Sequence, residues 1–344
     1  MTIAASRRMP VAMVADIGGT NARFALADVR QAQPQLSRQQ VLQSSAFASL
    51  QHAAEHYLQD VGVHPARAAI AVASPVGCDE IRLTNRAWSF SQRELKRSLG
   101  LGELHVLNDF GAVALAVPAV GPAGIATLHG EADSLQQGPI TVLGPGTGLG
   151  VALLIGDAAS GWRVIETEGG HVSFAPQGDE ECLIARWLNA RFGRVSAERL
   201  LCGTGLSHIH AALVAGDDLS SALDQRAAIR DPAEIVEAAL GGHDLMARRA
   251  LARFCAVLGS VAGDAALIHG ARSVVIAGGM VPRFIPFLRS SAFRERFLAK
   301  GRMTAYLESA GIHVITHPAP GLLGAAIYLR NSTRRPRRRV ADTG

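Results

Sequence analysis

The sequence predicts an α/β protein built as two lobes with a cleft between them. Two glycine-rich loops each follow an apolar strand, one at residues 16–21 and the other at 144–150. The chain has 344 residues, more than the ~250–300 that one hydrophobic core usually serves, so two lobes are expected. Strands and helices are mixed through both halves, which favours the α/β class.

The two loops have the composition of phosphate-binding turns. Glycine lets backbone N–H groups approach a polyanion with no Cβ in the way. Neither loop is a P-loop, because no Gly-Lys-Ser/Thr follows, and neither matches the dinucleotide fingerprint. Either loop alone could be a tight turn between strands. The pair favours a nucleotide held by both loops, and Asp16 in the first could hold Mg²⁺ through water.

Composition indicates a globular protein of a reducing compartment. Hydrophobic residues make up 48% of the chain and charged residues 18%, the opposite of a disordered sequence. The four cysteines are far apart and form no C-x-x-C pair, so we expect buried thiols rather than disulfides or a zinc ribbon. The start lacks the apolar region of a secretory signal, and the apolar stretch 111–127 is too short and interrupted to span a membrane.

The basic charge is concentrated in the tail. The formal net charge is +5, and five arginines of one segment account for it: Arg334, Arg335, Arg337, Arg338 and Arg339. The body is therefore neutral, whereas a nucleic-acid protein usually carries a basic face on its fold. We expect no nucleic-acid partner and a solvated tail.

In the first third, apolar alternation and capping residues mark the elements. Ser91 is a candidate N-cap, because serine oxygen accepts from the first free N–H groups of a helix. The predicted strands are 11–16, 23–28, 68–73 and 104–107, and the predicted helices are 44–59, 92–99 and 110–117.

The remaining two thirds repeat the mixture of strands and helices. A strand, a turn and a strand run from 140 to 155 around the second loop. The further predicted strands are 162–167, 273–277 and 313–316, and the predicted helices are 179–192, 233–240, 243–269 and 322–329.

Asn108 and Asp109 stand where a predicted strand ends and a helix begins. The partial positive charge of a helix N-terminus favours an ionised carboxylate there. Such an aspartate in a cleft suits a general base that takes a proton from a hydroxyl group. The alternative is an ordinary pair of capping residues.

Glu168 and His171 flank two glycines that allow a sharp reversal, so both side chains can point into one pocket. Glu198 lies at the start of a predicted helix. Carboxylates, an imidazole and the amide of Asn108 can match sugar hydroxyls, which both donate and accept. A zinc site is the competing interpretation, but no second histidine stands at ligand spacing. Taken singly, each residue could also be a surface or capping group.

Nine short motifs, in order, resemble those of the bacterial glucokinases, a branch of the hexokinase–actin–Hsp70 ATPase superfamily. The resemblance covers roughly residues 11–330, and so many motifs in one order make it specific. The motifs lie at 15–23, 74–77, 83–88, 107–110, 144–150, 168–171, 198–199, 277–280 and 320–324.

The resemblance implies a two-lobe ribonuclease H-like (actin-like ATPase) fold with an interlobe cleft. The small lobe would comprise 11–118 plus 318–332, the large lobe 119–317, and the basic tail 333–344. The implied activity is that of a cytoplasmic glucokinase, a transferase that phosphorylates the 6-hydroxyl of D-glucose and feeds glycolysis. ATP and Mg²⁺ would be its cofactors, glucose and ATP its partners, and a homodimer its assembly.

Carried over residue by residue, the resemblance makes Asp109 the catalytic base and Asp16 the carboxylate nearest to Mg²⁺. The implied sugar-binding residues are Asn108, Asp109, Gly148, Glu168, His171 and Glu198. The implied nucleotide-binding residues are Ala15, Asp16, Ile17, Gly18, Gly19, Thr20, Asn21, Gly146, Thr147, Gly278 and Gly279.

Two positions depart from the family pattern: Cys202 stands where serine or glycine is expected, and Thr167 where glycine is frequent. The cysteine-rich zinc signature of the related repressor–kinase family is missing after His171, which favours the glucokinase branch without a structural metal. Three rival functions remain open. They are a kinase for another hexose or hexosamine, a sugar-sensing regulator, and a filament-forming ATPase, which would lack the sugar-binding group.

Overall fold

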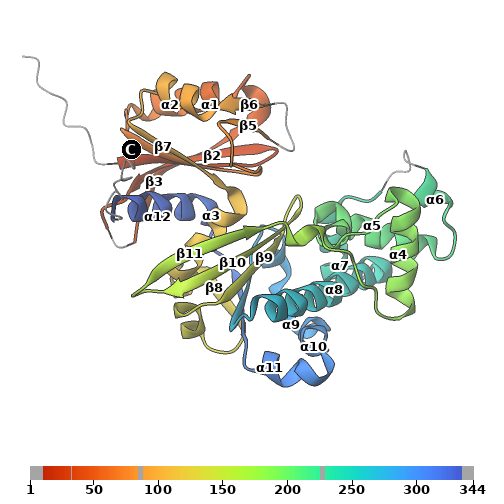
Figure 1. Ribbon diagram of the computed structural model, residues 1–344. Coiled ribbons are helices and arrows are strands. Elements are labelled where there is room, and N and C mark those ends of the chain that lie inside the picture. Colours follow the sequence, from red (N-terminus) through yellow and green to blue (C-terminus); the bar gives the residue numbers. More distant parts are fainter. Residues whose placement is uncertain (1–10, 32, 84–87, 225–228, 335–344) are drawn as a thin grey trace, which may run out of the picture. The chain divides into compact units, whose positions relative to one another are not determined.

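The computed structural model describes residues 11–31, 33–83, 88–224 and 229–334 (Figure 1). The motif residues Thr84 and Asn85 and the tail arginines from Arg335 onward lie outside the described residues. The chain divides into two compact units. The first unit runs up to Ala119 and resumes at Pro318, and the second runs from Val120 to His317.

The first unit is built on a five-stranded sheet of order β3-β2-β1-β4-β7. The strands are β1 (Val11–Ile17), β2 (Asn21–Asp28), β3 (Gln35–Gln43), β4 (Arg67–Val72) and β7 (Glu103–Asn108). β1 and β2 form the predicted hairpin around the first glycine loop, while β1, β4 and β7 run parallel. The carboxyl ends of these three strands therefore meet at one edge of the sheet.

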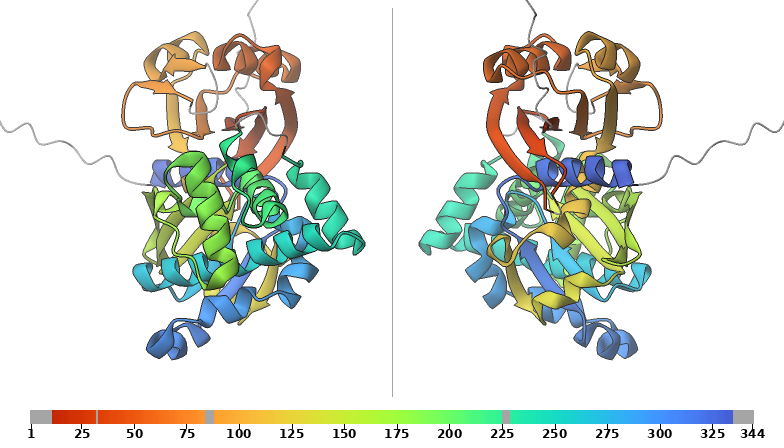
Figure 2. Two further views of the ribbon diagram at one scale, coloured as in Figure 1. Left: turned by 90° about the vertical axis from the view of Figure 1, so that its right-hand side faces the viewer. Right: turned by 90° about the vertical axis from the view of Figure 1, so that its left-hand side faces the viewer.

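Helices cover both faces of this sheet, because successive strand side chains point to opposite sides. Met13, Phe24 and Ile70 are buried with α1 (Leu50–Val61) on one face. On the other face the small side chains of alternate residues pack under α3 (Asp109–Ala116) and α12 (Pro320–Arg334). The side views of Figure 2 show the dark blue α12 lying along the sheet. The C-terminal helix is thus part of the first unit's core.

The second unit holds a six-stranded sheet of order β11-β10-β9-β12-β13-β8. The strands are β8 (Ile125–His129), β9 (Ile140–Pro145), β10 (Leu149–Asp157), β11 (Gly161–Thr167), β12 (Ser273–Ile276) and β13 (Gly311–Ile315). β9, β10 and β11 are antiparallel neighbours, while β9, β12 and β13 run parallel. Apart from β8, this is the strand order and direction of the first unit, although the sequence shows no short repeat.

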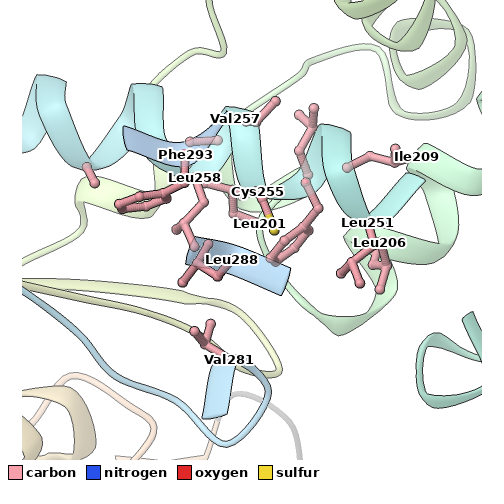
Figure 3. Close-up of a cluster of buried hydrophobic side chains, with 14 of the residues drawn as sticks. Leu201, Leu206, Ile209, Leu251, Cys255, Val257, Leu258, Val281, Leu288 and Phe293 are labelled. Carbon is pink, nitrogen blue, oxygen red and sulfur yellow. The ribbon is translucent and has the colours of Figure 1, made fainter. Parts of the chain in front are cut away.

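The helices of the second unit pack around α8 (Leu245–His269). Figure 3 shows α8 side chains such as Leu251 and Leu258 in one cluster with Leu206 and Ile209 of α5. Among the described residues, α8 is the one helix that is long and apolar enough to cross a membrane. Its most apolar 18-residue stretch is 61% buried inside the structure. The other helices are α4 (Gly178–Phe192), α5 (Gly203–Ala215), α6 (Ser220–Leu223), α7 (Pro232–Gly241), α9 (Ile285–Ser290), α10 (Phe293–Leu298) and α11 (Thr304–Glu308).

Several sequence predictions need correction. The helix expected from residue 44 begins at Leu50, because the Ser49 side chain caps it by accepting from His52 N–H. The edge strands β3 and β8 were not predicted, nor were α5 and the short helices of 285–308. Of the four cysteines expected to be buried, Cys78 is exposed and Cys182 is half-buried. The remaining short elements are β5 (Glu80–Arg82), β6 (Ser89–Ser91) and α2 (Gln92–Ser98), which Ser91 caps as predicted.

The contact between α12 and α3 depends on a glycine. A Cβ added at Gly324 would lie 1.7 Å from the carbonyl oxygen of Ala112. Alanine gains about 1 kcal/mol of helix propensity over glycine, but overpacking a close contact usually costs about 1–3 kcal/mol or more. We expect Gly324→Ala to lower the free energy of unfolding by about 2 kcal/mol, measured by urea unfolding. Gly77→Ala is the matched control, because a Cβ there meets no atom within 4 Å; equal stability of the two variants would contradict the packing.

A buried histidine makes the second unit sensitive to acid. His313 on β13 is fully buried, with its ring nitrogens 3.1 Å from Thr127 Oγ1 and 2.9 Å from Ser134 Oγ. Burial lowers the pKa of His313 from 6.5 to about 4, so between these values the unfolded chain binds a proton that the folded protein does not. Stability from the neutral ring is therefore present above pH 6.5 and lost as the pH falls.

At pH 5 the loss should be roughly 2 kcal/mol relative to pH 7.5. His313→Asn removes this titration, so the difference in melting temperature between the wild type and the variant should shrink as the pH drops from 7.5 to 5. A constant difference over that range would show that His313 does not titrate between the two states.

Candidate active site

The first glycine loop lies at the carboxyl edge of the first unit's sheet. Its turn is closed by a hydrogen bond from Gly18 N–H to Asn21 O (3.0 Å), and Ser44 N–H donates to Thr20 O (3.0 Å). Ala15 and Ile17 are buried in the strand, while Thr20 is exposed at the tip. The loop is thus anchored on both sides and presents its backbone at the strand ends.

Asp16 lies near the end of β1, close to the turn of this loop. Its carboxylate is 3.4 Å from Arg23 Nη1, and its side chain is only 19% exposed. A Cβ at Gly321, in the first turn of α12, would lie 2.9 Å from Asp16 Cγ. Burial raises the pKa of Asp16, and the charge and hydrogen bond of Arg23 partly offset that effect.

Asn108 and Asp109 lie at the same edge of the sheet. The register pairs Ile17 with Val72 and Val72 with Asn108, which places Asn108 two strands from the end of β1. Asn108 caps α3, since its Oδ1 accepts from the N–H groups of Phe110 and Gly111 at 3.0 Å each. The capping role is confirmed, and the amide NH₂ is the part of the side chain that could bind a ligand. Asp109, in the first turn, is half-buried and accepts from Phe110 N–H (2.8 Å).

The second glycine loop is packed against two other segments of its unit. Gly146 N–H donates to Gly148 O (2.8 Å), and Gly203 N–H, at the start of α5, donates to Gly146 O (2.9 Å). Gly278 follows β12 with a φ of 94°, and a Cβ there would lie 2.2 Å from Pro145 O. The structure therefore brings Gly278 to the loop that carries Gly146 and Thr147. At Gly279 a Cβ would meet nothing within 4 Å.

Glu168 and His171 lie close together, as their spacing predicted, and Glu198 joins them. His171 lies between the two carboxylates, with Nε2 3.9 Å from Glu168 Oε2 and Nδ1 3.8 Å from Glu198 Oε1. Glu198 Oε2 also accepts from Leu149 N–H in the second loop (2.9 Å). The glycines of this segment are required, since a Cβ at Gly170 would lie 2.2 Å from Leu149 O. The polar group and the second glycine loop thus adjoin.

Backbone pairing holds the two halves of this polar group together. Ala197 N–H donates to Val172 O (2.9 Å), and Phe174 N–H donates to Val195 O (3.0 Å). Arg194 Nη2 donates to His171 O (2.7 Å). Glu198 itself lies in a single 3-10 turn, Ala197–Arg199, rather than at the start of a helix, and α5 follows it at Gly203.

A family model described as Glucokinase matches residues 13–332. The chain belongs to the glucokinase family. A glucokinase of Chromobacterium violaceum is 44% identical over 319 residues, which make up 92% of this chain and 88% of that protein. The reaction of the family is the ATP-dependent phosphorylation of glucose, and the chain is an enzyme of that class (EC 2.7.1.2).

Solved glucokinase structures have the same fold. A glucokinase crystal structure from an Antarctic psychrotroph superposes with a TM-score of 0.80 at 36% identity, covering 94% of this chain and 99% of that one. A Balamuthia mandrillaris glucokinase in complex with glucose gives a TM-score of 0.78 at 20% identity, with 95% of each chain covered; this likeness concerns the fold alone. The fold is the actin-like ATPase fold predicted from the motifs.

The two departures from the glucokinase pattern have local explanations. Cys202 is the N-cap of α5, and its Sγ accepts from Gly205 N–H at 3.3 Å. A serine oxygen at an N-cap accepts from the first turn of a helix in the same way. Thr167 Oγ1 donates to Val151 O (2.8 Å) and accepts from Gly169 N–H (3.2 Å), which fixes the backbone on both sides of Glu168. Both residues stabilise the backbone beside the site.

The donor set of this glucokinase fits magnesium brought by a nucleotide. Mg²⁺ usually binds one or two protein carboxylates and completes its shell with phosphates and water. Asp16 offers one largely buried carboxylate at a phosphate-type loop, and the described residues hold no group of three or more His, Cys, Asp or Glu suited to a metal. The arrangement therefore suits an ion that arrives with ATP.

Two functional contacts were missed by sequence reasoning. Arg23 lies in the first motif, 15–23, but the sequence assigned it no role; counting outward from the two-residue turn Gly19–Thr20 of the hairpin places it opposite Asp16. Arg194 had no signal in the sequence, because its contact is to a backbone oxygen 23 residues away.

Proposed function

We propose that the chain transfers the γ-phosphoryl group of ATP to the 6-hydroxyl of D-glucose, with Asp109 as the base. The observation that carries this assignment is the group of Glu168, His171 and Glu198, which adjoins the second phosphate loop through Glu198 and Leu149 N–H. A hydroxyl-binding group beside a phosphate loop is the arrangement that a sugar kinase needs.

Glucose would be held through its hydroxyls. The exposed side chains of Glu168 and His171 and the half-buried one of Glu198 offer acceptors and an imidazole that can donate or accept. The amide NH₂ of Asn108 adds a donor, since its oxygen is used in capping α3. Gly148 leaves room for the Glu198 carboxylate, which a Cβ would meet at 2.4 Å.

The nucleotide would be held by both glycine loops. Backbone N–H groups of both loops would bind the phosphates, apart from those of Gly18 and Gly146, which close the turns. Gly278 and Gly279 would lie by the adenosine. Asp16 would hold Mg²⁺ directly or through water. When bound, the ion supplies positive charge that offsets the negative charge of the phosphates.

Phosphoryl transfer needs positioning more than covalent work from the protein. Asp109 would orient the 6-hydroxyl and accept its proton as the bond to phosphorus forms. Its place in the first turn of α3 favours the ionised form, which a base requires. Exclusion of water around the sugar would limit ATP hydrolysis.

A kinase for another hexose or hexosamine would keep the same loops and differ only in the sugar contacts. A panel of hexoses and hexosamines at fixed ATP, measured by coupled ADP release, separates these activities. The highest kcat/KM should belong to glucose. A homodimer and a cytoplasmic location stay predictions from the family resemblance.

Asp109→Ala should leave glucose binding largely intact and lower kcat by ~10²–10⁴, the usual contribution of a positioned general base. Turnover is measured by coupled ADP release and glucose binding by calorimetry. Glu94→Ala is the matched control, because Glu94 is an exposed acid in the first turn of another helix. Near-normal turnover of the purified Asp109→Ala protein would remove the residue from this role.

Glu168→Gln and His171→Ala should raise the KM for glucose about 10-fold or more and change the KM for ATP less than about 2-fold. The reason is that a site built to bond hydroxyls loses its matching partners. Glu237→Gln, an exposed glutamate on α7, is the control for charge loss. A larger effect on ATP than on glucose in both variants would contradict the sugar assignment.

A further inference from the structure

One carboxylate touches both the sugar-binding group and the second phosphate loop. Glu198 Oε2 accepts from Leu149 N–H at 2.9 Å, while Oε1 faces His171 Nδ1 at 3.8 Å. Its side chain is 30% exposed, against 76% for Glu168 and 57% for His171. Of these three residues, Glu198 is the one whose side chain hydrogen-bonds to the loop.

The loop is shaped around this carboxylate. A Cβ at Gly148 would lie 2.4 Å from Glu198 Oε2 and 3.2 Å from Cδ, whereas a Cβ at Gly146 in the same loop would meet only Gly148 O, at 3.9 Å. The carboxylate therefore lies directly against the backbone of residues 148–149 and is hydrogen-bonded to it, so we expect a shift of one to perturb the other.

The negative charge of Glu198 affects how strongly the neighbouring loop would bind phosphates. The loop is proposed to bind a polyanion, and a carboxylate next to it repels that polyanion. Sugar hydroxyls that donate to Glu198, together with His171 at its other oxygen, would spread the negative charge and fix the side chain against Leu149 N–H. Bound sugar should therefore make the loop more favourable for phosphates.

We propose that Glu198 couples the two substrates, so that glucose tightens nucleotide binding and nucleotide tightens glucose binding. The inference rests on the proposed sugar role of Glu198 and adds a second role to it, the positioning of the second phosphate loop. Coupling between binding sites is reciprocal, so the two enhancements must be equal.

The first test measures binding of the non-hydrolysable analogue AMPPNP, with Mg²⁺, by calorimetry with and without glucose. In the full-length wild-type protein, saturating glucose should tighten AMPPNP binding about 10-fold, within the usual range of such couplings. In Glu198→Gln, which keeps the size of the side chain and removes the charge, the enhancement should fall below about 2-fold. Binding of AMPPNP without glucose should become tighter, because the repulsion is gone.

The second test perturbs the phosphate loop and measures the sugar. Gly148→Ala should displace the Glu198 carboxylate and weaken glucose binding about 10-fold in the absence of any nucleotide. Gly121→Ala, a glycine-to-alanine change outside both loops in the same unit, is the control, and it should leave glucose affinity within about 2-fold because its Cβ meets no atom within 4 Å. In Gly148→Ala/Glu198→Ala the alanine at 198 relieves the clash, so the double variant should bind glucose no worse than Glu198→Ala alone.

The outcomes separate this inference from the proposed function. If Glu168→Gln and His171→Ala do not weaken glucose binding, the sugar assignment itself is wrong. If they do, but Glu198→Gln keeps the wild-type enhancement or Gly148→Ala binds glucose normally, the coupling role is wrong and the sugar site stands. Additive losses in the double variant would also overturn it. Melting temperatures identify any variant that does not fold. Glu198→Gln fills the same volume as the wild-type side chain, so it should fold and can test the coupling even if Gly148→Ala does not fold.

Discussion

The site of the second unit depends on close backbone contact with the strand–turn–strand of β9 and β10. Three segments approach it: the turn before His171, the start of α5, and the residues after β12. At Gly170 and Gly278 an added Cβ would lie 2.2 Å from a carbonyl oxygen of this strand–turn–strand. Only glycine permits such distances, so the glycines decide where the groups proposed to bind sugar and nucleotide meet.

The parallel strands explain why the functional residues of each unit gather at one edge. In the first unit β1, β4 and β7 end together, which brings the loop at Asp16 and the capping pair Asn108–Asp109 to the same side. In the second unit β9 and β12 end together, which brings Gly278 beside Pro145. Apart from β8, the two sheets have the same strand order, so the same strand ends carry different residues in the two units.

A buried ion-pair group joins the helices of the second unit. Glu181 is fully buried on α4 and accepts from Arg253 of α8 and Arg296 of α10. Its other oxygen accepts from Gln177 N–H at the start of α4 (2.8 Å). Removing one partner of such a group is costly because it leaves a buried charge uncompensated. The group therefore fixes how α4 leaves the segment that follows His171.

The sequence by itself determined the two-sheet α/β class, the two glycine hairpins, and the residues that form the polar group around His171. These follow from local signals: apolar alternation, glycine at tight turns, and capping residues such as Ser91 and Asn108. Polar edge strands escaped prediction, since β3 owes its conformation to pairing with β2 rather than to its own residues. Tertiary structure alone decided that Arg23 faces Asp16, that Arg194 binds His171 O, and that Glu198 bonds Leu149 N–H. These contacts join residues distant in the chain, and no local pattern of residue types encodes a distance in space.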